Sequence, residues 1–324
     1  MIVHLPRMVV YDLATTTRFR GLTRRQGVLI DGAAGWGEWS PFPEYDAGEA
    51  AWWWAAALEA AEEGYPTPVR DAVEVNCTIP AVSAADAHAR TLASGCRTAK
   101  VKVAERGQSL ADDLARVEAV RDALGASGQV RIDANGAWTV DEALVALRQL
   151  DRVGALEYAE QPCATTEDLA DLRRRLARGG HALRIAADES IRRSGDPQRV
   201  VELEAADIAV LKVQPLGGVR RCLRLAEQLG LPVVVSSALE TSVGIRMGVA
   251  LAAALPELPF ACGLNTVPLL AGDVSANPLV AVAGRLPVRE VTVDERPDWR
   301  ADAPTAAWWQ ARLEQVQART GDLR

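Results

Sequence analysis

From Val73 onward, short β-branched runs alternate with stretches that have the periodicity of amphipathic helices. This alternation predicts a parallel sheet whose strands are joined by helical crossovers. Eight strands, at about 30 residues per unit, are enough to close a TIM-type barrel of the α/β class. The strand candidates are Glu74–Cys77, Thr98–Val103, Gln129–Asp133, Leu156–Glu160, Leu183–Asp188, Asp207–Val213, Pro232–Ser237 and Phe260–Gly263.

The first 70 residues have a different pattern, which predicts a small α+β domain. Three short strands, with a turn signal at Asp31-Gly32, precede an Ala-rich helix. We expect a polar loop between the first two strands. The strands are expected at Met8–Tyr11, Gly27–Ile30 and Gly35–Trp39, the loop at Thr15–Arg25 and the helix at Ala47–Glu63.

The last stretch, from Val288 to Arg324, breaks the strand and helix rhythm. It has a strand candidate near Val291 and a helix candidate over Thr305–Thr320. We expect this segment to return to the N-terminal domain and pack there. The predicted division is therefore an N-terminal part of a capping domain over residues 1–72, a barrel over 73–284, and a C-terminal segment of the cap over 285–324.

Charge and composition argue against several classes of partner. The net charge of −7 disfavours a nucleic-acid partner, which calls for a basic face. No apolar run reaches the roughly 20 residues needed to cross a bilayer, and the first residues lack the pattern of a signal peptide. We therefore expect a cytoplasmic protein with no membrane partner. The scattered cysteines and histidines predict neither a disulfide framework nor a zinc site.

Three carboxylates end three neighbouring strand candidates: Asp133, Glu160 and Asp188. Barrel active sites lie at the C-terminal ends of the strands, so we expect these groups to converge. Converging carboxylates repel one another unless a cation lies between them, and an all-oxygen ligand set suits Mg²⁺. Any one of these acids alone is better explained as a solvated strand end or a helix N-cap. All three at successive strand ends favour a metal site.

The only lysines of the chain, Lys100, Lys102 and Lys212, all fall at predicted strand ends. The other basic residues are arginines, and a lysine offers what arginine cannot, a neutral amine when its pKa is depressed. Lys100 and Lys102 share one face of a strand, so each ammonium lowers the pKa of the other. The alternative is that these are solvated lysines at exposed strand ends.

The strands that carry Lys102 and Lys212 lie across the barrel from one another. These two lysines would therefore flank a substrate from opposite faces, with the metal at one edge. Such an arrangement suits removal of a proton α to a carboxylate, since a metal on the carboxylate oxygens stabilises the enediolate that forms. The sequence thus predicts a small-molecule carboxylate as the substrate.

The ordered set Lys-x-Lys, Asp, Glu, Asp, Lys resembles the enolase superfamily in its muconate-lactonizing subgroup. The flanking words agree with this, and the resemblance covers the whole chain. It implies a modified (β/α)7β barrel with an α+β capping domain built from both termini, and Mg²⁺, or Mn²⁺ in its place, as cofactor. The words are Arg-Ile-Asp-Ala-Asn-Gly-Ala-Trp around Asp133, Glu-Gln-Pro from Glu160, Asp-Glu-Ser from Asp188 and Val-Leu-Lys-Val-Gln-Pro around Lys212.

Within this subgroup, the chain most resembles the o-succinylbenzoate synthase family of the menaquinone pathway. The matching words include Phe19-Arg20-Gly21 and the run from Ser236 to Gly244. The resemblance implies a hydro-lyase in which Lys102 removes a proton from the cyclohexadiene substrate and returns it to the leaving hydroxyl. Lys212 would stabilise the intermediate and Lys100 would tune Lys102. The implied substrate contacts are Arg20, Asn135, Ser236, Ser237 and Gly263, with the loop around Arg20 closing over the site.

Two other activities of the subgroup stay in view. Dipeptide epimerases carry an Asp-x-Asp at the eighth strand for the substrate ammonium, whereas this chain has Gly263-Leu264-Asn265 there. An ammonium without a carboxylate partner is costly to bury, which argues against that activity. An N-succinylamino acid racemase needs the same two lysines and also binds a succinyl group. The stretch Thr266–Leu269 is less typical of a synthase, so this alternative stays open.

Overall fold

The computed structural model describes residues 7–320, which begin with an antiparallel sheet of three strands in the order β1-β2-β3. The strands are β1 (Arg7–Phe19), β2 (Leu22–Gly32) and β3 (Gly35–Trp39). The polar loop predicted over Thr15–Arg25 is wrong, because β1 and β2 run through this stretch and pair up to Phe19 and Leu22. Arg20 and Gly21 form the turn, with φ of 50° and 78°, as a two-residue hairpin loop requires.

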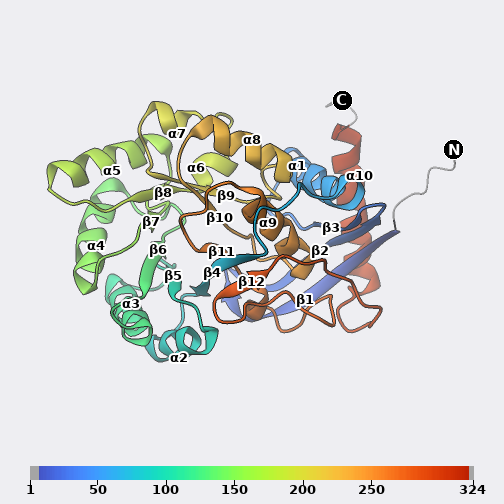
Figure 1. The fold of residues 1–324 in the computed structure, drawn as a ribbon, viewed down its shortest axis with the longest axis horizontal. Helices are drawn as coiled ribbons and strands as arrows, with labels where there is room; N and C mark the ends of the chain where they lie inside the picture. Colours follow the sequence, from blue (N-terminus) through green and yellow to red (C-terminus); the bar gives the residue numbers. More distant parts are fainter. Residues whose placement is uncertain (1–6, 321–324) are drawn as a thin grey trace.

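Two helices cover this capping sheet, one from each end of the chain (Figure 1). Helix α1 (Ala47–Leu58) is capped by Asp46 and ends in a π-helical turn (Glu59–Glu63), so the predicted helix is confirmed in extent. Helix α10 (Ala303–Thr320) covers the helix predicted over Thr305–Thr320 and packs against α1. The rings of Trp39 and Trp309 meet edge to face, with centroids 5.4 Å apart.

The barrel is a parallel sheet in the order β10-β9-β8-β7-β6-β5-β4-β11. A parallel bridge between Ser236 and Gly263 joins the end of β10 to β11. The predicted barrel and its eight strands are therefore confirmed. The strands are β4 (Ala72–Ile79), β5 (Thr98–Lys102), β6 (Gln129–Asp133), β7 (Ala159–Glu160), β8 (Ile185–Ala187), β9 (Ile208–Leu211), β10 (Val233–Val235) and β11 (Cys262–Asn265).

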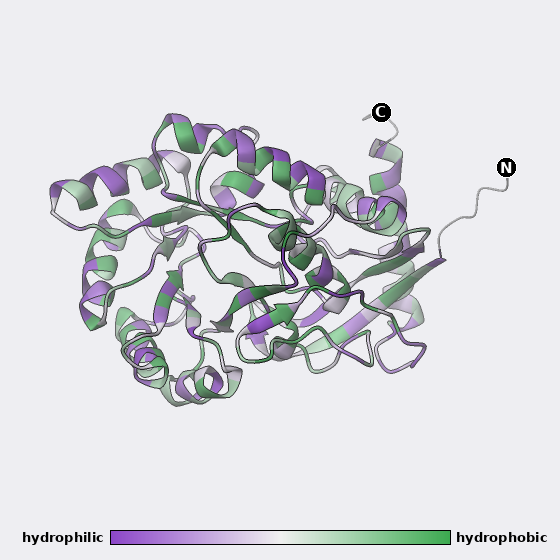
Figure 2. Ribbon diagram, in the orientation of Figure 1, coloured by the Kyte–Doolittle hydropathy of each residue, from purple (hydrophilic) through white to green (hydrophobic). Residues whose placement is uncertain are grey.

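Helices surround the barrel, and bands of hydrophilic and hydrophobic residues alternate along them, as in amphipathic helices (Figure 2). Three of them, α2, α6 and α7, lie outside the helices that the sequence predicts at residues 111–124, 141–150, 167–177, 219–229 and 243–255. The short strand β12 (Arg285–Pro287), which pairs antiparallel with β4, was not predicted either. The helices are α2 (Ala84–Ser94), α3 (Leu110–Leu124), α4 (Val140–Val153), α5 (Thr166–Arg178), α6 (Glu189–Arg192), α7 (Arg199–Glu202), α8 (Val219–Leu229) and α9 (Ser242–Ala254), with a 3-10 turn at Val267–Leu269.

The strand predicted near Val291 is wrong. The side chain of Val291 is buried, but its backbone joins no sheet. The nearby pairing to β4 is made by β12 instead, so Val291 contributes packing alone. The domain boundaries at residues 72 and 284 stay a prediction, and residues 1–6 and 321–324 at the outer ends of that division lie outside the described residues. Within residues 7–320, none of the helices is long and apolar enough to span a membrane.

Candidate active site

A cavity at the C-terminal ends of the barrel strands gathers most of the predicted site residues. The β1–β2 hairpin reaches it from the capping sheet, so residues from both layers line it. Side chains that are distant in the sequence thus face one space. The predicted residues that line the cavity are Arg20, Lys100, Lys102, Asp133, Asn135, Lys212, Ser236, Ser237 and Gly263.

The three predicted metal ligands are buried beside this cavity, with Asp133, Glu160 and Asp188 each at most 1% exposed. Asp133 pairs in register with Lys102 on β5 and with Glu160 on β7. Asp188 directly follows β8. Neighbouring parallel strands therefore deliver the three carboxylates to the same rim, as the order of the strands predicts.

Each carboxylate is paired with a lysine. Lys100 Nζ donates to both oxygens of Glu160, at 2.9 and 3.0 Å. Lys102 Nζ donates to Asp133 Oδ2 at 2.5 Å. Lys212 Nζ donates to Asp188 Oδ2 at 2.5 Å. All three lysines of the chain thus reach the site.

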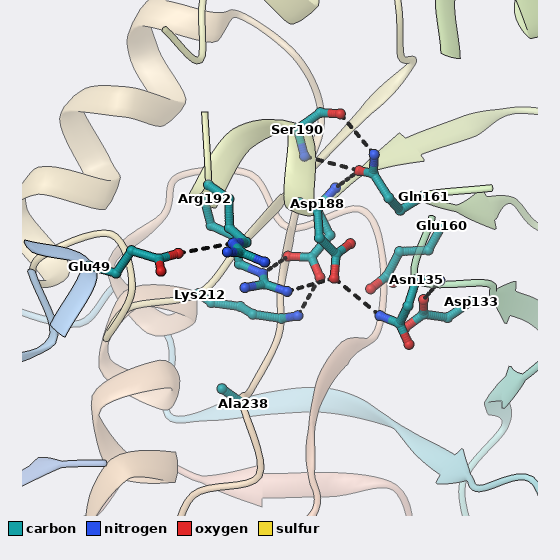
Figure 3. A network of polar contacts seen from close by, with 12 residues as sticks. Glu49, Asp133, Asn135, Glu160, Gln161, Asp188, Ser190, Arg192, Lys212 and Ala238 are labelled. Atoms are coloured by element: carbon teal, nitrogen blue, oxygen red, sulfur yellow. Dashed lines mark hydrogen bonds and ion pairs between the residues drawn. The ribbon is translucent and has the colours of Figure 1, made fainter. Parts of the chain in front are cut away.

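Asp188 has a second cationic partner on its other oxygen. Arg192 Nε donates to Asp188 Oδ1 at 2.9 Å, so the carboxylate lies between Arg192 and Lys212 (Figure 3). Asp133, Asn135 and Glu160 lie on the side of Asp188 away from Arg192 in this view. These hydrogen bonds fix the orientation of the Asp188 carboxylate relative to the other two acids.

The surroundings shift the pKa values of the two lysines of β5 in opposite directions. Burial lowers the pKa of Lys102, and the positive charge of Lys100 lowers it further, against the opposing effect of Asp133. Burial also disfavours the charged form of Lys100, but Glu160 and Asp133 outweigh this and raise its pKa above the ordinary value. A neutral amine is therefore more accessible at Lys102 than at Lys100.

The pKa values of the acids reflect their burial and mutual repulsion. Burial and the nearby charge of Asp133 raise the pKa of Glu160 to about 7, although Lys100 opposes the shift. Burial acts in the same direction on Asp133 and Asp188. Their cationic partners, chiefly Lys102 for Asp133 and Arg192 for Asp188, outweigh it and lower both pKa values. Glu160 is therefore the one of the three acids whose charged form is disfavoured, by burial and by repulsion from Asp133.

The donor chemistry of the site fits a hard divalent ion. The acids offer carboxylate oxygens only, and Oε2 of Glu189, next to Asp188, is buried without a hydrogen-bond partner. Across residues 7–320, no three His, Cys, Asp or Glu side chains already converge at ligand distance, and the acids face lysine ammonium groups instead. The residue types suit a hard divalent ion better than a soft metal.

Several cavity residues were not predicted from the sequence. The centroid of the Phe19 ring lies 5.6 Å from Lys102 Nζ. The motif that contains Phe19 is recognisable in the sequence, but it predicts no contact for this residue. The hydroxyls of Ser237 and Thr266 share a hydrogen bond of 2.8 Å across two strand ends. Leu239 lines the cavity with a left-handed φ of 65°. The other two are Thr78 and Ala238.

Gly263 lies next to Ser236 at the edge of the cavity. A Cβ built at this position would lie 2.5 Å from Ser236 Oγ, closer than atoms in contact can approach. The sequence had marked Gly263 as the site where related enzymes carry a carboxylate. The structure adds that a side chain at position 263 would require the hydroxyl of Ser236 to turn away.

Comparison with known proteins agrees with this geometry. Residues 83–295 match the family described as enolase C-terminal domain-like, and residues 10–61 match the enolase N-terminal domain-like family. The chain is 63% identical over 308 residues to the o-succinylbenzoate synthase of Thermobifida fusca, covering 95% of each chain. It is 53% identical over 313 residues to the o-succinylbenzoate synthase of Mycolicibacterium smegmatis, covering 95% of this chain and 94% of that one.

Solved structures agree on the fold. The muconate lactonizing enzyme of Pseudomonas fluorescens, in complex with muconolactone, aligns with a TM-score of 0.75 at 24% identity, over 94% of this chain and 98% of that one. The L-Ala-D/L-Glu epimerase of Bacillus subtilis aligns with a TM-score of 0.71 at 23% identity, over 89% and 96% of the two chains. By its family matches and its relatives, the chain belongs to the enolase superfamily, in the family of the o-succinylbenzoate synthases.

Proposed function

We propose that this chain is a metal-dependent hydro-lyase that dehydrates 2-succinyl-6-hydroxy-2,4-cyclohexadiene-1-carboxylate to 2-succinylbenzoate in menaquinone biosynthesis. The observation that carries the proposal is the cavity shared by Lys102 and Lys212 in a chain 63% identical to a synthase. Abstraction of a proton α to a carboxylate requires a general base, and an amine beside buried carboxylates can serve as that base.

In this proposal, Lys102 carries out both proton transfers. As a neutral amine, Lys102 takes the proton from the ring carbon that carries the carboxylate. The resulting ammonium gives that proton to the leaving hydroxyl, water departs, and the ring becomes aromatic. One group serves both steps, so the elimination is syn. The lowered pKa of Lys102 supports this role, because it increases the fraction of neutral amine.

The acids and the other lysines would stabilise charge. Asp133, Glu160 and Asp188 would hold Mg²⁺, or Mn²⁺ in its place, which supplies Lewis-acid stabilisation of the negative charge on the substrate carboxylate. Lys212 is paired with Asp188 and would stay cationic on the other side of the substrate. Lys100 is paired with Glu160 and would keep the pKa of Lys102 low.

The remaining predicted residues would bind the substrate. Asn135 Oδ1 accepts a hydrogen bond of 2.6 Å from Lys102 Nζ, so Asn135 would orient the base. Ser236, Ser237 and Gly263 would border the succinyl arm. Arg20 stacks on the ring of Phe42, with its guanidinium carbon 4.5 Å from the ring centroid. From there Arg20 and its hairpin would close over the substrate and exclude water.

A second candidate is an N-succinylamino acid racemase. It is favoured by the presence of two lysines in the one cavity, since racemisation uses one base on each face of the α carbon.

Incubating the protein with Mg²⁺ and the cyclohexadiene substrate tests the first proposal, by loss of the substrate's absorbance. The absence of turnover above a Lys102→Ala control would defeat it. Incorporation of deuterium at the α carbon of N-succinyl amino acids would support the second.

A further inference from the structure

Glu38, on β3, has a fully buried carboxylate at the junction between the capping sheet and the barrel. From the capping side, Tyr11 Oη donates to Oε1 at 2.7 Å and Ser40 Oγ donates at 2.8 Å. From the barrel side, the backbone N–H and hydroxyl of Thr241 donate to Oε2 at 3.2 and 2.5 Å, and the Gly244 N–H donates at 2.9 Å. Glu38 is therefore fastened to both layers at once.

The barrel donors belong to the start of α9. A carboxylate at a helix N-terminus is favoured by the exposed N–H groups and the helix dipole. Gly244 allows the approach, since a Cβ there would lie 2.4 Å from Glu240 Cβ and 2.9 Å from Glu38 Oε2. The segment just before α9, from Ser236 to Leu239, forms one wall of the cavity. Glu38 thus anchors the C-terminal end of that wall.

Arg25, on β2, fastens the same wall at a second point. Its side chain is buried, and Nε donates to the carbonyl oxygen of Leu239 at 2.8 Å. Leu239 has a left-handed φ of 65°, which a leucine holds only where its surroundings impose it. Arg25 also donates to Ser40, the residue that binds Glu38. The two charged residues therefore act on the wall together.

This junction does not contact the proton-transfer machinery. Lys102 is held by Asp133, the last residue of β6, and by Asn135 just after it, on a different part of the rim. Arg20 lies in the hairpin turn directly before β2, and Arg25 lies on that strand. The junction therefore connects the hairpin to the cavity wall. A change at Glu38 should therefore move the surface that receives the substrate and leave the base in place.

We propose that Glu38, together with Arg25, is a positioning residue that sets the cavity wall Ser236–Leu239 against the capping hairpin and so governs affinity for the substrate arm remote from the reacting carbon. The proposal rests on the proposed function for the identity of the substrate. It assigns to these residues an effect on KM and on product binding, with the rate of the chemical steps largely preserved.

The test compares Glu38→Gln and Thr241→Val with two controls. Thr241→Ser keeps the hydroxyl that donates to Glu38. Val316→Ala opens a cavity in the core that packs α10 against the cap, and so destabilises the fold without removing any of the hydrogen bonds of the junction. For each variant we would measure kcat, KM, the dissociation constant of 2-succinylbenzoate by calorimetry, and the melting temperature.

We expect Glu38→Gln and Thr241→Val to raise KM and the product dissociation constant at least about tenfold, with kcat within about threefold of the wild type. Thr241→Ser and Val316→Ala should keep both affinities within about twofold, although Val316→Ala melts earlier. If Glu38→Gln does not fold, the comparison of Thr241→Val with Thr241→Ser decides alone.

The inference is overturned if the wild type is active and Glu38→Gln and Thr241→Val have the same KM as the wild type. It is also overturned if kcat falls while KM stays constant, or if Val316→Ala raises KM as much as Thr241→Val. A wild type that neither dehydrates the substrate nor binds 2-succinylbenzoate defeats the proposed function instead, and the inference falls with it.

Discussion

Lys102 and Asp133 lie opposite one another on the neighbouring strands β5 and β6, with Nζ of the lysine 2.5 Å from Oδ2 of the aspartate. A proposed base and a proposed metal ligand are thus in direct contact. Movement of either group alters the other, since the carboxylate holds the ammonium and opposes the fall in its pKa. A divalent ion held by Asp133 would compete with the Lys102 ammonium for this carboxylate, and so would favour the neutral form of Lys102.

Replacing Lys212 should reduce turnover without unfolding the protein. Lys212→Ala removes one cation from Asp188, but Arg192 stays bound to the other oxygen. We expect kcat for dehydration to fall by about 10²- to 10³-fold, the effect of removing one stabilising group for developing charge. Steady-state kinetics and circular dichroism measure the two parts of this prediction. Lys212→Arg keeps a cation, so loss of activity in Lys212→Ala alone identifies charge as the cause. Equal loss in both variants would contradict an electrostatic role.

Divalent metal should stabilise the folded protein through the three carboxylates. At a Mg²⁺ concentration about 100 times its dissociation constant, the unfolding free energy should rise by about 2.7 kcal/mol. Melting with Mg²⁺ and with EDTA measures this shift. Glu160→Gln should abolish the shift. Asp207→Asn, which loses an acid paired with Arg173, should keep it. An equal shift in wild type and Glu160→Gln would place the ion elsewhere.

Glu240 should make stability depend on pH. Burial and the nearby charge of Glu38 raise its pKa to about 7, above the value of 4.5 for a free glutamate. The folded state therefore binds this proton more tightly than the unfolded state. The resulting stability is present below pH 4.5 and is lost as the pH rises toward 7, for a total of about 3 kcal/mol.

Glu240→Gln stays neutral and should not show this loss. Urea unfolding of both proteins at pH 5 and pH 8 isolates the contribution, because other titrating groups are common to the pair. The variant should gain stability relative to the wild type between the two pH values. A constant difference between the two proteins would show that Glu240 titrates normally in the folded state.

Much of the barrel and of its rim could be predicted from local patterns. The acids at the ends of β6, β7 and β8 were identified because each directly follows an apolar run, and strand order then sets them side by side. The hairpin around Arg20 was missed because its polar, Arg-rich strands lack clear alternation. Helix α2 was missed for a similar reason, since it is rich in alanine and Leu92 is its only large apolar residue.

The capping junction could not be predicted in this way. Glu38 and Thr241 are 203 residues apart, and Arg25 and Leu239 are 214 apart. Neither pair has a local signature, because each depends on how the capping sheet lies on the barrel. Phe19 and Leu239 enter the cavity for the same reason. Site residues that lie at strand ends can be predicted from the sequence. Site residues whose position depends on the contact between the capping sheet and the barrel can be identified only from the structure.

The central claim is that Lys102 acts as the base toward the cyclohexadiene substrate. The most direct measurement is the dehydration rate of Lys102→Arg beside the wild type, in saturating Mg²⁺. Arginine keeps the positive charge but cannot become a neutral amine near pH 7, so the account predicts a loss of at least about 10³-fold with the fold intact. A Lys102→Arg protein that turns over the substrate within about tenfold of the wild type would contradict it.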